Sequence, residues 1–107
     1  MIAILWKFQA KGGREHEFEQ IYGADGAWAQ LFRSSKEFRG TELLASSEQS
    51  GDYVTIDRWA SFEAFQQFLK QHGEEYRALD VKCAAVREQE SRIGVFATAN
   101  NEQPFVC

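Results

Sequence analysis

Apolar and polar residues alternate in four segments of the chain, and this pattern predicts four β-strands. The first strand covers 2–9, and two more, over 38–45 and 53–59, flank a turn-rich segment that predicts a β-hairpin. The last strand covers 92–99. On the first strand the alternation places four apolar side chains on one face: Ile2, Ile4, Trp6 and Phe8.

Charged residues in the two hairpin strands predict their register. Pairing Glu42 with Arg58 sets opposite charges side by side. The same register pairs Leu44 with Ile56, whereas a slip of one residue sets Glu42 against Asp57. We therefore expect the first register.

Helical spacing replaces alternation between the first two strands. Apolar residues recur on one face from Arg14 to Tyr22, until Gly23 interrupts the pattern. Asp25 can then cap a second short helix, which carries Trp28 on its inner side. We expect a helix broken into two short pieces.

The strongest periodic signal follows Ser61, which is placed to cap a long helix. A continuous helix through Arg87 would be about 40 Å long, so we expect a bend or break at Gly73. The inner stripe consists of eight residues in steps of three and four: Phe62, Phe65, Leu69, His72, Tyr76, Leu79, Cys83 and Val86.

The order strand, helix, strand, strand, helix, strand predicts an α+β, ferredoxin-like split βαβ fold, with a four-stranded antiparallel sheet and its helices on one face. We expect one domain over 1–99 and a C-terminal tail over 100–107. Several strands carry apolar residues on both faces. A second copy of the sheet is the simplest cover for the outer face, so we expect a homodimer in the form of a dimeric α/β barrel.

Composition narrows the classes of function. The 107 residues carry a net charge of −4 with no continuous basic stripe, so nucleic acid and membrane surfaces are not expected partners. No apolar run approaches the roughly 20 residues of a membrane span, and the N-terminus lacks a signal-peptide pattern. We expect a cytoplasmic protein. Its two cysteines predict neither a disulfide framework nor a zinc site, and Cys83 is expected in the core.

Three polar residues are candidates for catalysis. His72 interrupts an apolar helical stripe one turn before Tyr76. A neutral imidazole beside a phenol could take a proton from an acidic hydroxyl, although His72 could equally be a partly buried histidine held by hydrogen bonds. Asp57 shares a strand face with aromatic residues that would raise its pKa, which suits a base. Alternatively, Asp57 pairs with Arg39 or another arginine at a dimer interface.

Aromatic residues are abundant, and most of them must fill the core. Those from the first strand, the broken helix and the long helix could also converge on a gap between sheet and helices, which would suit a flat aromatic ligand. We expect this lining to include Trp6, Phe8, Trp28, Phe32 and Phe68.

Several of these features together resemble the antibiotic biosynthesis monooxygenase family of small dimeric α+β barrels. They are the aromatic first strand, the turn over 22–28, the Gly-Thr-Glu-Leu-Leu run over 40–44, and Trp59 followed by Ser61 and Phe65. The resemblance implies a homodimer with a pocket in each subunit. Characterised oxygenases of the family act on quinols and anthrone-like molecules with O₂ and without metal or flavin, so no cofactor is expected.

The haem-degrading branch of the family is a poorer match. That branch has an Asn on the first strand, a Trp early in the long helix and a haem-ligating His further along it. Aligned without gaps from Trp59, this sequence has Phe68 in place of that Trp and Ala78 in place of that His, and its first strand has no Asn. His72 falls a turn and a half too early. We therefore disfavour haem degradation.

Two hypotheses of function stay open. The first is a cofactor-independent monooxygenase that acts on a small hydroxylated aromatic, with His72 or Asp57 as the base and Tyr76 as a hydrogen-bond partner. The second is a non-catalytic dimeric protein of the same fold, which binds a small molecule or is associated with stress. In that case His72 and Tyr76 are satisfied polar groups of the core.

Overall fold

The computed structural model describes residues 1–99 and shows the expected order of elements. The predicted tail over 100–107, with Cys107, lies outside the described residues. The strands are β1 (Ile2–Ala10), β2 (Phe38–Ala45), β3 (Asp52–Trp59) and β4 (Arg87–Ala97), and the helices are α1 (Glu15–Tyr22), α2 (Ala27–Phe32) and α3 (Phe62–Cys83).

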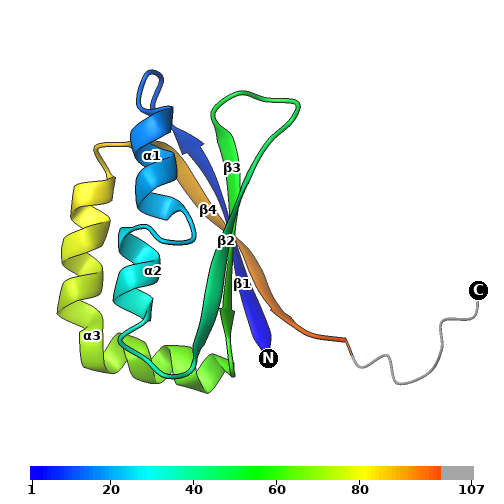
Figure 1. Cartoon of the computed structure of the whole chain (residues 1–107), viewed down its shortest axis with the longest axis vertical. Helices are drawn as coiled ribbons and strands as arrows, with labels where there is room; N and C mark the ends of the chain where they lie inside the picture. The colour runs from blue at the N-terminus through cyan, green and yellow to red at the C-terminus, as the bar shows by residue number, and fades with distance from the viewer. Residues whose placement is uncertain (100–107) are drawn as a thin grey trace, which may run out of the picture.

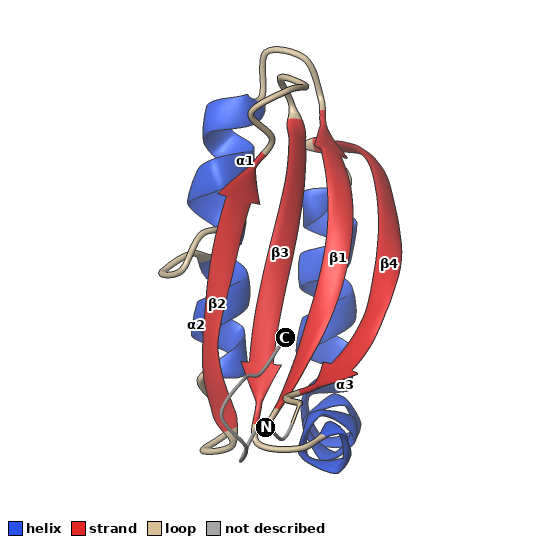
Figure 2. Ribbon diagram, turned by 90° about the vertical axis from the view of Figure 1, so that its right-hand side faces the viewer, coloured by secondary structure: helices blue, strands red, loops and turns tan. Residues whose placement is uncertain are grey.

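The four strands form one antiparallel sheet in the order β2-β3-β1-β4. All three helices cover the same face of this sheet, and no helix within residues 1–99 covers the other face (Figures 1 and 2). The predicted α+β, ferredoxin-like arrangement is confirmed. Among the described residues, no helix has the length and apolar character needed to cross a membrane.

Alternation along the central strands places the core on the helical side of the sheet. Ile4 and Phe8 of β1 lie opposite Asp57 and Tyr53 of β3, and all four side chains point toward the helices. Side chains from the three helices complete this core: Phe18, Tyr22, Trp28, Phe32, Phe68 and Cys83. The predicted core position of Cys83 is confirmed, with 1% of its surface exposed.

The predicted hairpin register is wrong by two residues. Glu42 lies opposite Ile56, and Gly40 lies opposite Arg58. The observed alignment runs without a break from Ala45 opposite Tyr53 to Gly40 opposite Arg58, and a register shift follows only between Phe38 and Gly40, where Gly40 has a φ of 122°. The shift of two keeps every side chain on its expected face, and Arg58 still reaches Glu42 diagonally at 3.2 Å.

Three details of the elements differ from expectation: the cap of α2, the bend of α3 and the start of β4. Gly26, not Asp25, caps α2, because the exposed Asp25 carboxylate binds Arg33 at 2.9 Å instead. The bend of α3 falls at His72, where φ and ψ are −123° and 25°, one residue before the predicted Gly73. Strand β4 begins at Arg87, five residues early, because the polar start of an edge strand shows no apolar alternation.

Candidate functional site

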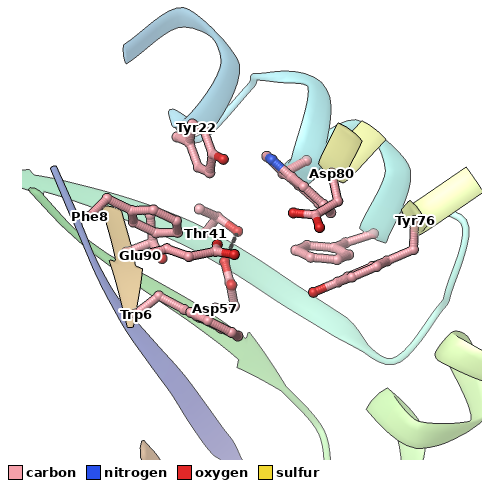
Figure 3. Close-up of a pocket in the computed structure, with 11 residues that line it drawn as sticks. Trp6, Phe8, Tyr22, Thr41, Asp57, Tyr76, Asp80 and Glu90 are labelled. Atoms are coloured by element: carbon pink, nitrogen blue, oxygen red, sulfur yellow. Dashed lines mark hydrogen bonds between the residues drawn. The ribbon is translucent and has the colours of Figure 1, made fainter. Parts of the chain in front are cut away.

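A cavity lies between the inner face of the sheet and the helices (Figure 3), with an empty volume of about 410 Å³ that includes space open to solvent. Every strand and every helix contributes to its wall. Its lining combines six aromatic rings with two threonines and three carboxylates: Trp6, Phe8, Tyr22, Trp28, Phe32, Thr41, Thr55, Asp57, Tyr76, Asp80 and Glu90. Such a mixture suits a flat molecule with a few polar groups.

Four of the five aromatic residues predicted to bind a ligand line this cavity. Trp6 and Phe8 come from β1 and stack with ring centroids 6.2 Å apart, whereas Trp28 and Phe32 come from α2. Phe68 does not line the cavity, because its ring is 1% exposed and packs in the core. The apolar wall is therefore built by β1 and α2.

Asp57 is the carboxylate that the sheet strand β3 contributes to the cavity. Its Oδ1 accepts a hydrogen bond of 2.7 Å from the hydroxyl of Thr41, which lies directly opposite on β2. Burial raises the pKa of Asp57 to about 6, and the hydrogen bond from Thr41 offsets only part of that effect. Within the chain, Arg39 lies 3.6 Å from Glu37. Pairing of Asp57 with an arginine of a second copy stays a prediction.

Tyr76 points into the same cavity from α3, and Figure 3 shows its hydroxyl and the Asp57 carboxylate directed into one space. Burial raises the pKa of Tyr76 to about 12, and the charges of Asp80, Asp57 and Glu90 act in the same direction. The phenol therefore keeps its proton at neutral pH and can donate a hydrogen bond. Its ring stands edge-on to Trp28 at a centroid distance of 4.9 Å.

His72 does not line the cavity. It sits at the bend of α3, where its ring stacks on Phe68 at 5.2 Å and its Nδ1 lies 2.7 Å from Oε2 of Glu75. The structure thus brings Asp57 and Tyr76 together and leaves the third predicted catalytic residue outside. Its position matches the alternative reading of a histidine held by hydrogen bonds and packing.

Five lining residues were not predicted: Tyr22, Thr41, Thr55, Asp80 and Glu90. Asp80 could have been found, because it lies one helical turn after Tyr76 on the same face of α3. Thr41 required the true hairpin register, which alone places it opposite Asp57. Glu90 required the early start of β4.

An ion cluster around Arg87 connects three residues of the cavity lining. Its Nη2 lies 3.0 Å from Oδ1 of Asp80 and 3.5 Å from Oε1 of Glu90, and its Nη1 donates to the Tyr22 hydroxyl at 3.2 Å. Only 12% of the Arg87 side chain is exposed. One guanidinium thus joins α1, α3 and β4 at the cavity wall.

Within residues 1–99, no three His, Cys, Asp or Glu side chains lie in an arrangement that could hold a metal ion. Two of the three cavity carboxylates, those of Asp80 and Glu90, face the guanidinium of Arg87 instead.

Comparisons with known proteins add family and fold. The chain is similar to SnoaB, a cofactor-independent oxygenase from Streptomyces nogalater, with 23% identity and a TM-score of 0.70 over 96% of this chain and 97% of that one. It is similar to Rv0793 from Mycobacterium tuberculosis, with 18% identity and a TM-score of 0.67 over 95% of this chain and 98% of that one. It is also similar to a NIPSNAP domain protein from Burkholderia xenovorans, with 13% identity and a TM-score of 0.68 over 98% of this chain and 100% of that one. A search of curated proteins found no significant match. The family model described as antibiotic biosynthesis monooxygenase matches residues 1–79, so the chain belongs to the antibiotic biosynthesis monooxygenase family.

Proposed function

We propose that this protein is a cofactor-independent monooxygenase that acts on a small hydroxylated aromatic, of the quinol or anthrone kind, in the cavity between sheet and helices. One observation carries the proposal. A carboxylate with a pKa near 6, that of Asp57, shares an aromatic-walled cavity with the phenol of Tyr76. Membership of the family and the fold shared with SnoaB support the proposal.

The first chemical step is removal of a proton from the substrate. Above pH 6 the Asp57 carboxylate is ionised, and its raised pKa makes it a stronger base than an ordinary aspartate. It takes the proton from the substrate hydroxyl, or from the activated CH₂ of an anthrone. Tyr76 donates a hydrogen bond to the oxygen on which negative charge develops. The aromatic wall packs against the flat ring of the substrate and shields part of it from solvent.

The resulting anion is electron-rich enough to reduce O₂ itself. With an anthrone, the carbanion adds O₂ and takes up a proton, which gives a hydroperoxide on the substrate carbon. Loss of the remaining proton from that carbon breaks the O–O bond, so a ketone forms and water leaves. The CH₂ is oxidised by four electrons, one oxygen atom enters the product and the other becomes water. Asp57 ends in its starting state after it has returned its proton.

We further propose that the protein acts as a homodimer. The outer face of the sheet carries apolar side chains from every strand, and Phe96 and Leu44 are 50% and 44% exposed. This face is the one turned to the viewer in Figure 2, and none of the three described helices covers it. A second copy would bury it. Sedimentation equilibrium tests this, and a monomer at micromolar concentration contradicts it.

Oxygen consumption tests the proposed reaction. Metal-stripped protein is mixed with anthrone, 1,4-naphthohydroquinone and 1-naphthol in an oxygen-electrode chamber. We expect uptake above autoxidation with at least one compound, and a loss of at least about 100-fold in Asp57→Asn. Glu48→Gln, which changes an exposed carboxylate in the β2–β3 loop, is the matched control and should keep full activity.

The same assay separates the proposal from a purely binding protein. A binding protein would hold such compounds without oxygen uptake, and Asp57→Asn would then alter affinity alone. Uptake that is unchanged in Asp57→Asn would instead assign the base to another residue and contradict the mechanism.

A further inference from the structure

The charges around the cavity are unbalanced. Among residues 1–99, its lining holds the carboxylates of Asp57, Asp80 and Glu90, but no lysine, arginine or histidine. All three carboxylates act on the Tyr76 phenol, so their fields overlap inside the cavity. A bound molecule is therefore surrounded by negative charge and aromatic faces.

The cation beside this cavity is Arg87, and it is already engaged. Its Nη2 faces Asp80 and Glu90 at 3.0 Å and 3.5 Å, and its Nη1 donates to Tyr22. The side chain is only 12% exposed, so it cannot swing out to meet a ligand without breaking these contacts. One guanidinium also cannot neutralise three carboxylates. Asp57 has Thr41 as its hydrogen-bond partner and faces the cavity with its charge uncompensated.

We propose that this arrangement makes the site selective for charge: it accepts hydroxyaromatic molecules without an anionic group and rejects those that carry a carboxylate. The inference rests on the proposed function, because it names the substrate class of the same cavity. A ligand carboxylate would lose its water next to the uncompensated charge of Asp57 and next to two carboxylates that share one guanidinium, and no lining residue within 1–99 offers a cation to pair with it. A neutral hydroxyl, in contrast, can donate its proton to Asp57.

Anaerobic calorimetry with two ligands of nearly equal shape tests this selectivity. The probes are 6-hydroxy-2-naphthoic acid, an anion at pH 7.5, and its neutral primary amide. We expect the amide to bind at least about tenfold more tightly than the acid. Equal affinities, tighter binding of the acid, or no binding of the amide would each overturn the inference.

A variant identifies the source of the discrimination. Asp80→Asn removes one cavity carboxylate and frees part of Arg87, so the ratio of amide to acid affinity should fall at least about threefold. Glu48→Gln removes a remote charge and should leave the ratio unchanged. Circular dichroism checks that both variants fold, and an unchanged ratio in folded Asp80→Asn contradicts the assigned role of that carboxylate.

These measurements are independent of turnover because oxygen is absent. Selective binding of the amide without oxygen uptake in air would sink the oxygenase proposal and leave the charge selectivity standing. Oxygen uptake with both naphthalene compounds at equal kcat/KM would support the oxygenase proposal and contradict the charge selectivity.

Discussion

The inner face of β3 has two ends that serve different purposes. At one end Trp59 is fully buried, and four phenylalanine rings surround it at centroid distances of 5.3–5.5 Å: Phe32, Phe38, Phe65 and Phe68. Two residues earlier on the same face, Asp57 opens into the cavity with Thr41 opposite. A single strand therefore carries a closed core and an open site.

Side-chain size and polarity explain the difference. Around Trp59, large rings meet from β2, α2 and α3 and fill the space between the layers. Around Asp57, two of the neighbours on the sheet are the small side chains of Thr41 and Thr55, which leave volume unfilled on that side, whereas Ile4 lies opposite on β1. The core end stabilises the fold, and the site end keeps a carboxylate in a costly environment. Changes at the two ends should thus move stability in opposite directions.

The largest expected effect is at the core end. Trp59→Ala removes the ring around which four phenylalanines pack, so the free energy of unfolding should fall by about 3–5 kcal/mol. Urea denaturation followed by circular dichroism measures it. Trp6→Ala is the matched control, because Trp6 is only partly buried and borders the cavity, and it should lose clearly less. Equal losses would contradict the division between core and site.

The next largest effect is an increase in the free energy of unfolding, expected for Asp57→Asn. The carboxyl of Asp57 ionises near 3.8 in the unfolded chain and near 6 in the folded one. Its contribution to stability is therefore present below pH 4 and is lost as the pH rises through 6. Asp57→Asn removes this loss while its amide oxygen can still accept from Thr41.

We accordingly expect Asp57→Asn to be more stable than the natural protein by about 1–3 kcal/mol at pH 8. The gain should shrink toward zero as the pH falls to 4. Urea midpoints across this pH range measure it, with Glu48→Gln as the exposed control. A variant that is less stable at pH 8 would show that the carboxylate is not in a costly environment.

A smaller effect is expected for Tyr76→Phe, which removes one hydrogen-bond donor from the site. The lost donor should lower kcat about tenfold, because the developing charge on the substrate oxygen is no longer stabilised. The free energy of unfolding should change by less than about 0.5 kcal/mol, because no hydrogen bond between residues 1–99 uses this hydroxyl. Oxygen uptake and urea denaturation measure the two quantities. A full loss of kcat would contradict the role of Tyr76 as a hydrogen-bond donor alone.

Local patterns in the sequence were enough to predict the fold and much of the aromatic wall. Alternation in β1 and the helical stripe of α3 each concern residues near one another in the chain, and both predictions placed the right faces inward. The early part of β4 was missed, since residues such as Glu88 and Glu90 on an edge strand carry no apolar signal.

The polar part of the site depends on long-range alignment, and there the prediction fell short. In the predicted register Leu43 would lie opposite Asp57, so no hydroxyl would reach the carboxylate. The observed register, which is unbroken from Ala45 to Gly40, brings Thr41 there instead. Nothing in the local pattern of β2 indicates which of the two registers forms. A prediction can thus place every side chain on the correct face of the sheet and still miss the hydrogen-bond partner of one residue.

His72 provides the smallest and most discriminating test, because a sequence signal singled it out and the structure places it outside the cavity. Its ring stacks on Phe68 and its Nδ1 lies near Glu75, whose side chain is largely exposed. His72→Ala should therefore cost about 1 kcal/mol of stability and leave kcat within about twofold of the natural value. Urea denaturation and oxygen uptake on the same preparation measure both. A tenfold loss of kcat with an unchanged unfolding midpoint would return His72 to the reaction and would take the role of base away from Asp57.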